Sequence, residues 1–229
     1  NVDTGEVKVA LGISPQGAGQ AGSGFGPLTT WLDASSANAG YTALSGDFNA
    51  DGLSDLCLFK KSSGEFKVAF SNSKAFVDGT TWITGYATGK DALVSDFNND
   101  GLTDIGYWDK AAGRWYYAIS TGDKFVDKGI WLDGFGSSTD ESATTGDFNG
   151  NGITDAACFD KDQLGINRWT TKLSTNKPAD LLTEIDNGIG GRTRIIYTYA
   201  AGGDNPGLPF PVYVASSISL VNTFPAERS

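Results

Sequence analysis

Three stretches of the sequence combine oxygen-bearing side chains in a spacing that could hold a cation. Each has aspartate, asparagine and then aspartate or asparagine at positions 1, 3 and 5, a glycine at position 6 and an aspartate at position 9. Such oxygens suit Ca²⁺, which takes about six to eight oxygen ligands, and glycine permits the sharp turn at position 6. With the main-chain carbonyl at position 7, we predict about three Ca²⁺, one per loop. The predicted ligands are Asp47, Asn49, Asp51, Leu53 and Asp55 in the first loop, Asp96, Asn98, Asp100, Leu102 and Asp104 in the second, and Asp147, Asn149, Asn151, Ile153 and Asp155 in the third.

An EF-hand begins in the same way and is the first alternative. Its twelfth position requires a bidentate glutamate, and helices must flank the loop. The twelfth positions here are Leu58, Tyr107 and Cys158, which lie in β-type runs. We therefore place each predicted ion in a loop between two strands of a hairpin.

The second alternative is a set of Asp- and Asn-rich turns that bind no metal. Three loops of equal spacing argue against it, because a turn alone does not need an aspartate three residues after its glycine. Without cations, the carboxylates of each loop would also repel one another. Asn151 replaces aspartate at position 5 of the third loop, so we expect the weakest site there, since fewer ligand charges lower the affinity.

The elements that must position these loops recur with a period of about 50 residues. Each loop precedes an apolar run that ends in an aromatic residue. A glycine turn then leads into an alternating segment, at residues 64–70 and 113–119, and residues 5–11 form the same unit near the start. Each repeat thus contains about four short strands bounded by turn residues, which is typical of a propeller blade.

We therefore predict an all-β chain of β-propeller blades, each of four antiparallel strands. The back half of one blade occupies residues 1–33, and two complete blades follow at about 41–84 and 91–133. About three and a half blades fill residues 1–176, either as part of a larger propeller or as a ring that the last segment completes. Residues 177–229 form a second, β-rich segment.

Composition excludes several classes of protein. The formal net charge of −10 repels nucleic acid and anionic lipid, and no run of about 18 apolar residues predicts a membrane span. Two cysteines, Cys57 and Cys158, are too few for a disulfide framework, so we expect buried free thiols. The chain begins Asn-Val-Asp and contains no methionine, which favours a processed or excised piece of a longer protein.

No residue pattern in the chain predicts an enzyme. Histidine, the commonest general base and the commonest transition-metal ligand, is absent. There is no Gly-x-Ser-x-Gly elbow and no phosphate-binding P-loop. Paired carboxylates could hydrolyse glycosides, but the clustered ones already have the spacing of metal ligands.

The three loops, Asp-Phe-Asn-x-Asp/Asn-Gly-x-x-Asp, resemble the FG-GAP/VCBS calcium repeats of integrin-α-like β-propellers. The resemblance covers residues 1–175. Residues 180–191 and 193–197 resemble the stretch that follows such repeats in bacterial toxin-complex B components, virulence-plasmid B-type proteins and RHS-repeat proteins. This resemblance implies a large secreted or surface-delivered bacterial protein, in which the propeller is a gate or docking module.

These observations favour a non-catalytic, calcium-stabilised propeller segment that contacts other domains or subunits of a larger secreted protein. The alternative is a lectin or cell-surface adhesin that binds glycans between blades. Trp31, Trp82 and Trp131 recur at one blade position, which favours packing for them. Trp115 and Trp169 remain candidates for stacking on a sugar.

Overall fold

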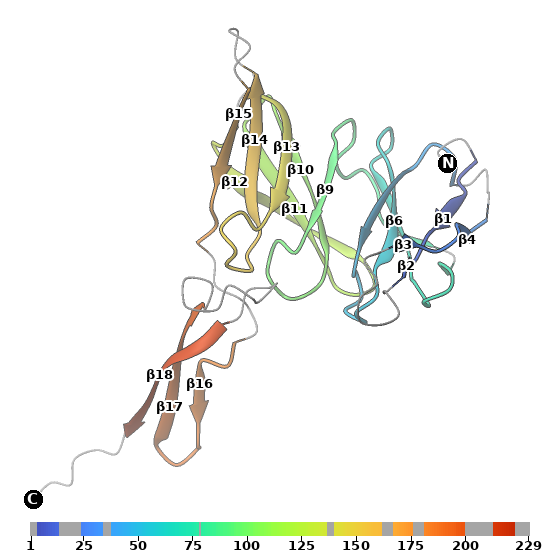
Figure 1. Cartoon of the computed structure of the whole chain (residues 1–229). Coiled ribbons are helices and arrows are strands. Elements are labelled where there is room, and N and C mark those ends of the chain that lie inside the picture. Colours follow the sequence, from blue (N-terminus) through green and yellow to red (C-terminus); the bar gives the residue numbers. More distant parts are fainter. Residues whose placement is uncertain are drawn as a thin grey trace, which may run out of the picture. The chain divides into compact units, whose positions relative to one another are not determined.

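The computed structural model consists of antiparallel β-strands (Figure 1). Within the described ranges, no helix has the length and apolar character that crossing a bilayer requires. The chain divides into two compact units, residues 1–97 with 101–140 and residues 98–100 with 141–229. The structure describes residues 4–13, 24–33, 38–77, 79–136, 140–161, 167–175, 181–199 and 213–222.

The first unit contains two four-stranded antiparallel sheets, each with its strands in sequence order. They confirm the two complete blades. In each, we call the first two strands the leading pair and the last two the trailing pair. The first complete blade is β5 (Thr42–Gly46), β6 (Asp55–Lys60), β7 (Glu65–Ala69) and β8 (Thr80–Ile83), and the second is β9 (Ala92–Ser95), β10 (Asp104–Asp109), β11 (Arg114–Ser120) and β12 (Phe125–Asp133).

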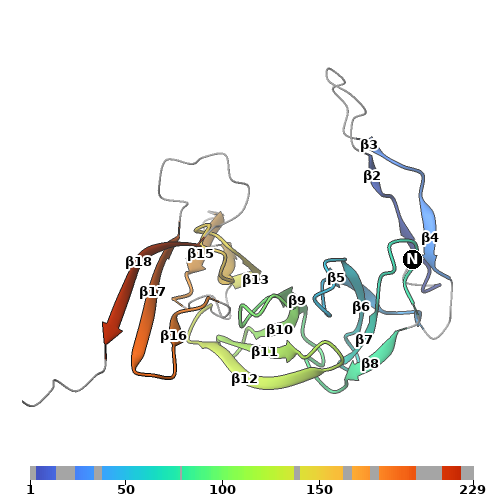
Figure 2. The same ribbon diagram turned by 90° about the horizontal axis from the view of Figure 1, so that it is seen from below.

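The N-terminal strands of this unit form only part of a blade. β1 (Val7–Val9) pairs with β4 (Thr29–Leu32), and β2 (Gly12–Ile13) pairs with β3 (Gly24–Phe25) beyond the end of that pair (Figure 2). The register of β1 and β4 shifts directly after Val7. The trailing pairs of the complete blades shift in the same way after Phe66 and Trp115. We therefore call the β1–β4 pair the trailing half-blade.

The main core of this unit lies between the two complete blades, where β5 contacts β9 and β8 contacts β12. Because side chains alternate across a strand, Phe66 and Val68 of β7 point together into this core and are buried. Cys57 lies in the same cluster as a free thiol, and burial raises its pKa. Cys158 is also a buried thiol that forms no disulfide, so both cysteines match the prediction of buried thiols.

The second unit contains two three-stranded antiparallel sheets. One is the predicted third blade as far as the structure describes it, and the other confirms a β-rich segment near the C-terminus. The predicted boundary between residues 176 and 177 lies outside the described residues. The strands are β13 (Asp140–Gly146), β14 (Asp155–Lys161) and β15 (Asn167–Lys172), then β16 (Glu184–Asp186), β17 (Gly191–Tyr199) and β18 (Tyr213–Asn222).

A carboxylate on β7 connects this strand to β8 and to Tyr41, which lies directly before β5. Glu65 accepts hydrogen bonds from the Tyr41 hydroxyl and, at 2.8 Å, from Thr81 Oγ1 of β8. The Tyr41 bond, followed by the Thr81 bond, lowers the pKa of Glu65.

We expect the Glu65→Gln substitution to lose stability at neutral pH and to approach the wild type in acid. A carboxyl whose pKa is lowered in the folded state stabilises the fold at pH values above its unfolded-state pKa of about 4.3. This contribution disappears as the pH falls through the folded-state pKa. Urea unfolding of both proteins between pH 7 and pH 3 measures the difference. A difference that stays constant with pH would contradict the argument.

Candidate cation-binding loops

The first loop is held by its own side chains at positions 1, 3 and 5. Asp47 Oδ2 accepts the Gly52 N–H at 2.9 Å, and Asn49 Oδ1 accepts the Asp51 N–H at 3.0 Å. Asp51 Oδ1 in turn accepts the Leu53 N–H at 2.8 Å. These oxygens are therefore fixed on one short loop between β5 and β6, which is what a cation-binding loop requires.

The third loop repeats this network between β13 and β14. Asp147 accepts the Gly152 N–H at 2.6 Å, and Asn149 Oδ1 accepts the Asn151 N–H at 3.0 Å. Asn151 Oδ1 accepts the Ile153 N–H at 2.9 Å. The amide of Asn151 thus replaces the Asp carboxylate in the loop fold, and only its charge is missing.

The hydrogen bonds of the second loop follow the same positions. Asp96 Oδ2 accepts the Gly101 N–H at 2.9 Å, and Asn98 Oδ1 accepts the Asp100 N–H at 3.1 Å. Asn98 also donates from Nδ2 to Asp100 Oδ2 at 2.8 Å. The predicted main-chain ligands at position 7 are Leu53, Leu102 and Ile153.

Position 4 of each loop has a left-handed backbone that the sequence analysis did not identify. Ala50 has φ of 61°, Asn99 of 60° and Gly150 of 74°. Gly at position 4 of the third loop and Asn at that position of the second were visible signals, because both residues tolerate this region. Ala50 gave no such signal.

The aspartate at position 9 has a role that its spacing did not reveal. Asp55 is buried, with 1% of its surface exposed, and it points back into the blade. Its Oδ2 accepts the Phe48 N–H at 3.2 Å, and its Oδ1 accepts the Ser71 N–H at 2.9 Å. Burial raises the pKa of Asp55, while the two amide bonds act in the opposite direction. Asp55 therefore connects its loop to the end of β7.

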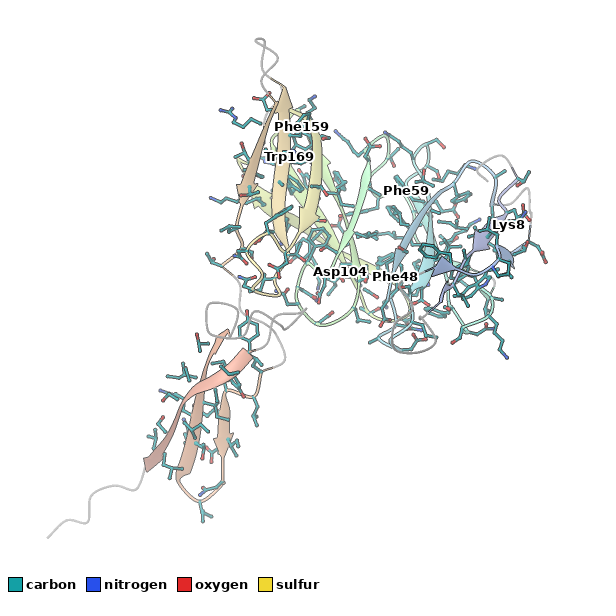
Figure 3. The ribbon with its side chains drawn as sticks, viewed as in Figure 1. Lys8, Phe48, Phe59, Asp104, Phe159 and Trp169 are labelled. Carbon is teal, nitrogen blue, oxygen red and sulfur yellow. The ribbon has the colours of Figure 1, made fainter. Side chains whose placement is uncertain are left out.

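The other two aspartates at position 9 make the same pair of bonds. Asp104, labelled in Figure 3, accepts the Phe97 N–H at 2.9 Å and the Ser120 N–H at 2.7 Å. Asp155 accepts the N–H groups of the equivalent phenylalanine, at 3.1 Å, and of Ser174, at 2.6 Å. We call this arrangement the carboxylate clamp. That these aspartates also bind calcium stays a prediction, which the contacts do not test.

The donor set fits a hard cation at positions 1, 3 and 5, where carboxylate and amide oxygens share one loop. Both oxygens of each clamp aspartate already accept a main-chain N–H, which leaves fewer of their lone pairs for an ion. Within the part of the chain that the structure describes, no three acidic or thiol side chains gather into a metal-binding group.

The tryptophans singled out in the sequence differ in their exposure, and Trp131 is half-buried. Trp31 and Trp82 are buried, as expected for a packing role. Trp115 is also buried, with its Nε1 donating to the Phe135 carbonyl at 3.0 Å, so it is not available to a sugar. Trp169 of β15 is 58% exposed beside Phe159, with ring centroids 5.1 Å apart (Figure 3).

Comparisons with known proteins agree with the repeat and the blades. The model of the FG-GAP-like repeat family matches residues 47–107, which contain the first two loops. A search of curated proteins gave no match. A solved structure of a lectin from Agrocybe aegerita, described as recognising non-reducing terminal N-acetylglucosamine, is 16% identical, with a TM-score of 0.46 over 87% of this chain and 57% of that one. This likeness is too low to carry an argument about fold or ligand.

Two toxin structures are more similar. The Tc holotoxin pore of Photorhabdus luminescens matches 97% of this chain with a TM-score of 0.66 and 18% identity. The TcdB2–TccC3–Cdc42 complex matches 84% of this chain with a TM-score of 0.61 and 18% identity. This chain covers only 11% and 10% of those chains. Residues 47–107 therefore match the FG-GAP-like repeat, and the chain has the fold of a segment of toxin-complex proteins.

Proposed function

We propose that this chain is a non-catalytic propeller segment, stabilised by calcium, that mediates or gates contacts within a larger secreted, toxin-like assembly. The observation that carries the proposal is the threefold repetition of one loop network between paired strands. The FG-GAP-like match over the first two loops supports the calcium, and the fold shared with toxin-complex chains supports the assembly. The clustered carboxylates have structural roles in the loops, which argues against their use in catalysis.

Calcium would be held by the oxygens at positions 1, 3 and 5, with the predicted main-chain carbonyl at position 7. In the first loop these are Asp47, Asn49, Asp51 and Leu53. A divalent cation there would neutralise carboxylates that share one loop, and it would hold β5 and β6 together. Because it binds the folded chain, it would stabilise the fold in proportion to RT ln(1 + [Ca²⁺]/Kd).

We expect the chain, stripped with EDTA and returned to Ca²⁺, to bind about three ions, one per loop, and to melt at a higher temperature. Elemental analysis, isothermal titration and thermal unfolding measure these effects. Asp51→Ala should remove one ion, and Asn151→Asp should tighten the weakest site. Mg²⁺ is the matched control, because it demands stricter octahedral geometry. A chain that binds no Ca²⁺ and melts identically in EDTA would have metal-free turns instead.

Sugar binding is the second candidate, and one observation favours it. Trp169 exposes a large aromatic face beside Phe159, and exposed aromatic faces can stack on sugars. A glycan array with the wild type and Trp169→Ala separates the two functions. Glycan binding that the substitution abolishes would favour the lectin function. An array without signal would favour the assembly module instead.

A further inference from the structure

The trailing half-blade begins with the same turn residue as the complete blades. Gly64 and Gly113 each end the turn that leads from the leading pair into the trailing pair, with φ of 65° and 62°. Gly5 stands at the equivalent position with φ of 68°. Among the described residues, β1 pairs only with β4. The edge of β1 that would meet a leading pair therefore has no partner strand there.

An apolar cavity of about 580 Å³ lies beside this edge. Val7 and Val9 of β1 line it, together with Leu11, which follows β1 and is 55% exposed. Trp31 and Phe76 also line it, as an edge-on aromatic pair with centroids 5.2 Å apart. The cavity thus presents an aromatic pair and a row of aliphatic side chains.

The equivalent place one blade further along is filled. Trp82 and Phe125 correspond to the aromatic pair of the cavity, with centroids 5.0 Å apart. Phe48, at position 2 of the first loop, lies against both, at 5.7 Å from Phe125 and 6.4 Å from Trp82. It is completely buried there. The cavity is therefore the place where a loop phenylalanine of a preceding leading pair would lie.

Polar groups around the two places correspond as well. At the filled place, Ser120 Oγ donates to the carbonyl of the loop phenylalanine at 2.7 Å, and the Thr103 N–H donates to the Asp47 carbonyl at 2.7 Å. Both donors belong to the second complete blade, and their hydrogen bonds hold the loop of the first complete blade. Their counterparts in the first complete blade, Ser71 and Ser54, line the cavity. The cavity thus has the same groups that hold an Asp-Phe loop elsewhere.

The face of β5 next to the cavity also differs from its counterpart on β9. Ala92 and Val94 of β9 pack against the core between the complete blades. The equivalent residues of β5, Ala43 and Ser45, are exposed. The difference is expected if a leading pair that would cover β5 is not among the described strands.

We propose that this cavity receives a two-stranded hairpin of the leading-pair type, whose Asp-Phe-Asn loop places its phenylalanine on Trp31 and Phe76. The hairpin adds antiparallel to the free edge of β1 and completes a four-stranded blade. Its source is a segment joined to Gly5 from the N-terminal side, because in both complete blades the left-handed glycine follows the leading pair directly. The inference does not depend on calcium.

A graft tests this directly. Residues 41–63, the chain's own leading pair and turn, are placed before Gly5 in the otherwise full chain. We expect those backbone amides of residues 7–9 that point away from β4 to exchange with deuterium at least about tenfold more slowly, because an added strand satisfies them. The matched control has Phe48→Ala in the grafted copy only and should lose most of this protection. Unchanged exchange in the graft, or equal protection in both grafts, would overturn the proposal.

The same hairpin, added as a separate peptide, tests whether the hairpin must be covalently joined to the chain. It also tests the site if the grafted chain does not fold. Added to the unaltered chain, the 41–63 peptide should protect residues 7–9 only weakly and at high concentration, since it lacks the covalent connection that raises its effective concentration. The Phe48→Ala peptide should not protect them. Protection by the peptide as strong as that of the graft would overturn the covalent source, and no protection at any soluble concentration would overturn the site.

Discussion

Replacing Asp55 with alanine is expected to lower the free energy of unfolding by roughly 2–6 kcal/mol in calcium-free buffer. The substitution leaves the N–H groups of Phe48 and Ser71 without their acceptor in a buried place. Each buried donor left unsatisfied costs roughly 1–3 kcal/mol. Urea unfolding in EDTA measures the loss, and the absence of calcium separates the clamp from any role as a ligand.

Asp51→Ala is the matched control, because it removes the same side chain four positions earlier in the same loop. Asp51 is exposed, and its bond to the Leu53 N–H can be replaced by water. Asp51→Ala should therefore lower the free energy of unfolding by about 1 kcal/mol or less. Asp55→Asn keeps one acceptor oxygen, so its loss in the free energy of unfolding should lie between those of Asp51→Ala and Asp55→Ala. Equal losses for Asp51→Ala and Asp55→Ala would mean that the clamp contributes nothing special to the fold.

The clamp explains why an aspartate stands three residues after the glycine in every loop. Loop and strand are separate in sequence, yet Asp104 connects position 2 of its loop to the end of β11 through two main-chain bonds. Such a bond pair positions the loop relative to the trailing pair whether or not an ion is present. Spacing that suggested a metal ligand therefore has a second, sufficient cause in the backbone, and only a calcium measurement separates the two.

The blades could be predicted from the sequence because their signals are local and repeated. Alternating residues such as Phe66 and Val68, and a turn glycine such as Gly64, mark the same strand in each unit. Three copies of the loop made the period visible. The four-stranded sheets and the trailing half-blade follow from that period alone.

The direction of the aspartate at position 9 could not be predicted, because it depends on partners far along the chain. Asp55 finds the Ser71 N–H 16 residues later, at the end of a strand whose register only the folded sheet defines. The same holds for Trp115, whose burial depends on packing rather than on its neighbours in sequence. The sequence motif also did not show that the phenylalanines at position 2 of different loops have different surroundings.

Those phenylalanines give the second large prediction. Phe48 and Phe148 both follow the first aspartate of a loop, but Phe48 is fully buried and Phe148 is 47% exposed. Phe48→Ala should lower the free energy of unfolding by about 3–5 kcal/mol, since it removes a buried ring from the core between the complete blades. Phe148→Ala, the matched control, should cost about 1 kcal/mol or less, because half of that ring is already in water.

Urea unfolding followed by circular dichroism compares the two variants, with the slope of the transition showing whether the denatured states stay alike. The Phe48 ring contacts Trp82 and Phe125, which come from the two different blades. Its loss should therefore also weaken the contact of the blades, and slow amide exchange at β8 and β12 should become faster together. Equal losses for the two phenylalanines, or faster exchange confined to one blade, would show that Phe48 does not join the blades. A large decrease in the free energy of unfolding, together with faster amide exchange at both β8 and β12, would indicate that the loop phenylalanine stabilises the first unit more than the ion site beside it does.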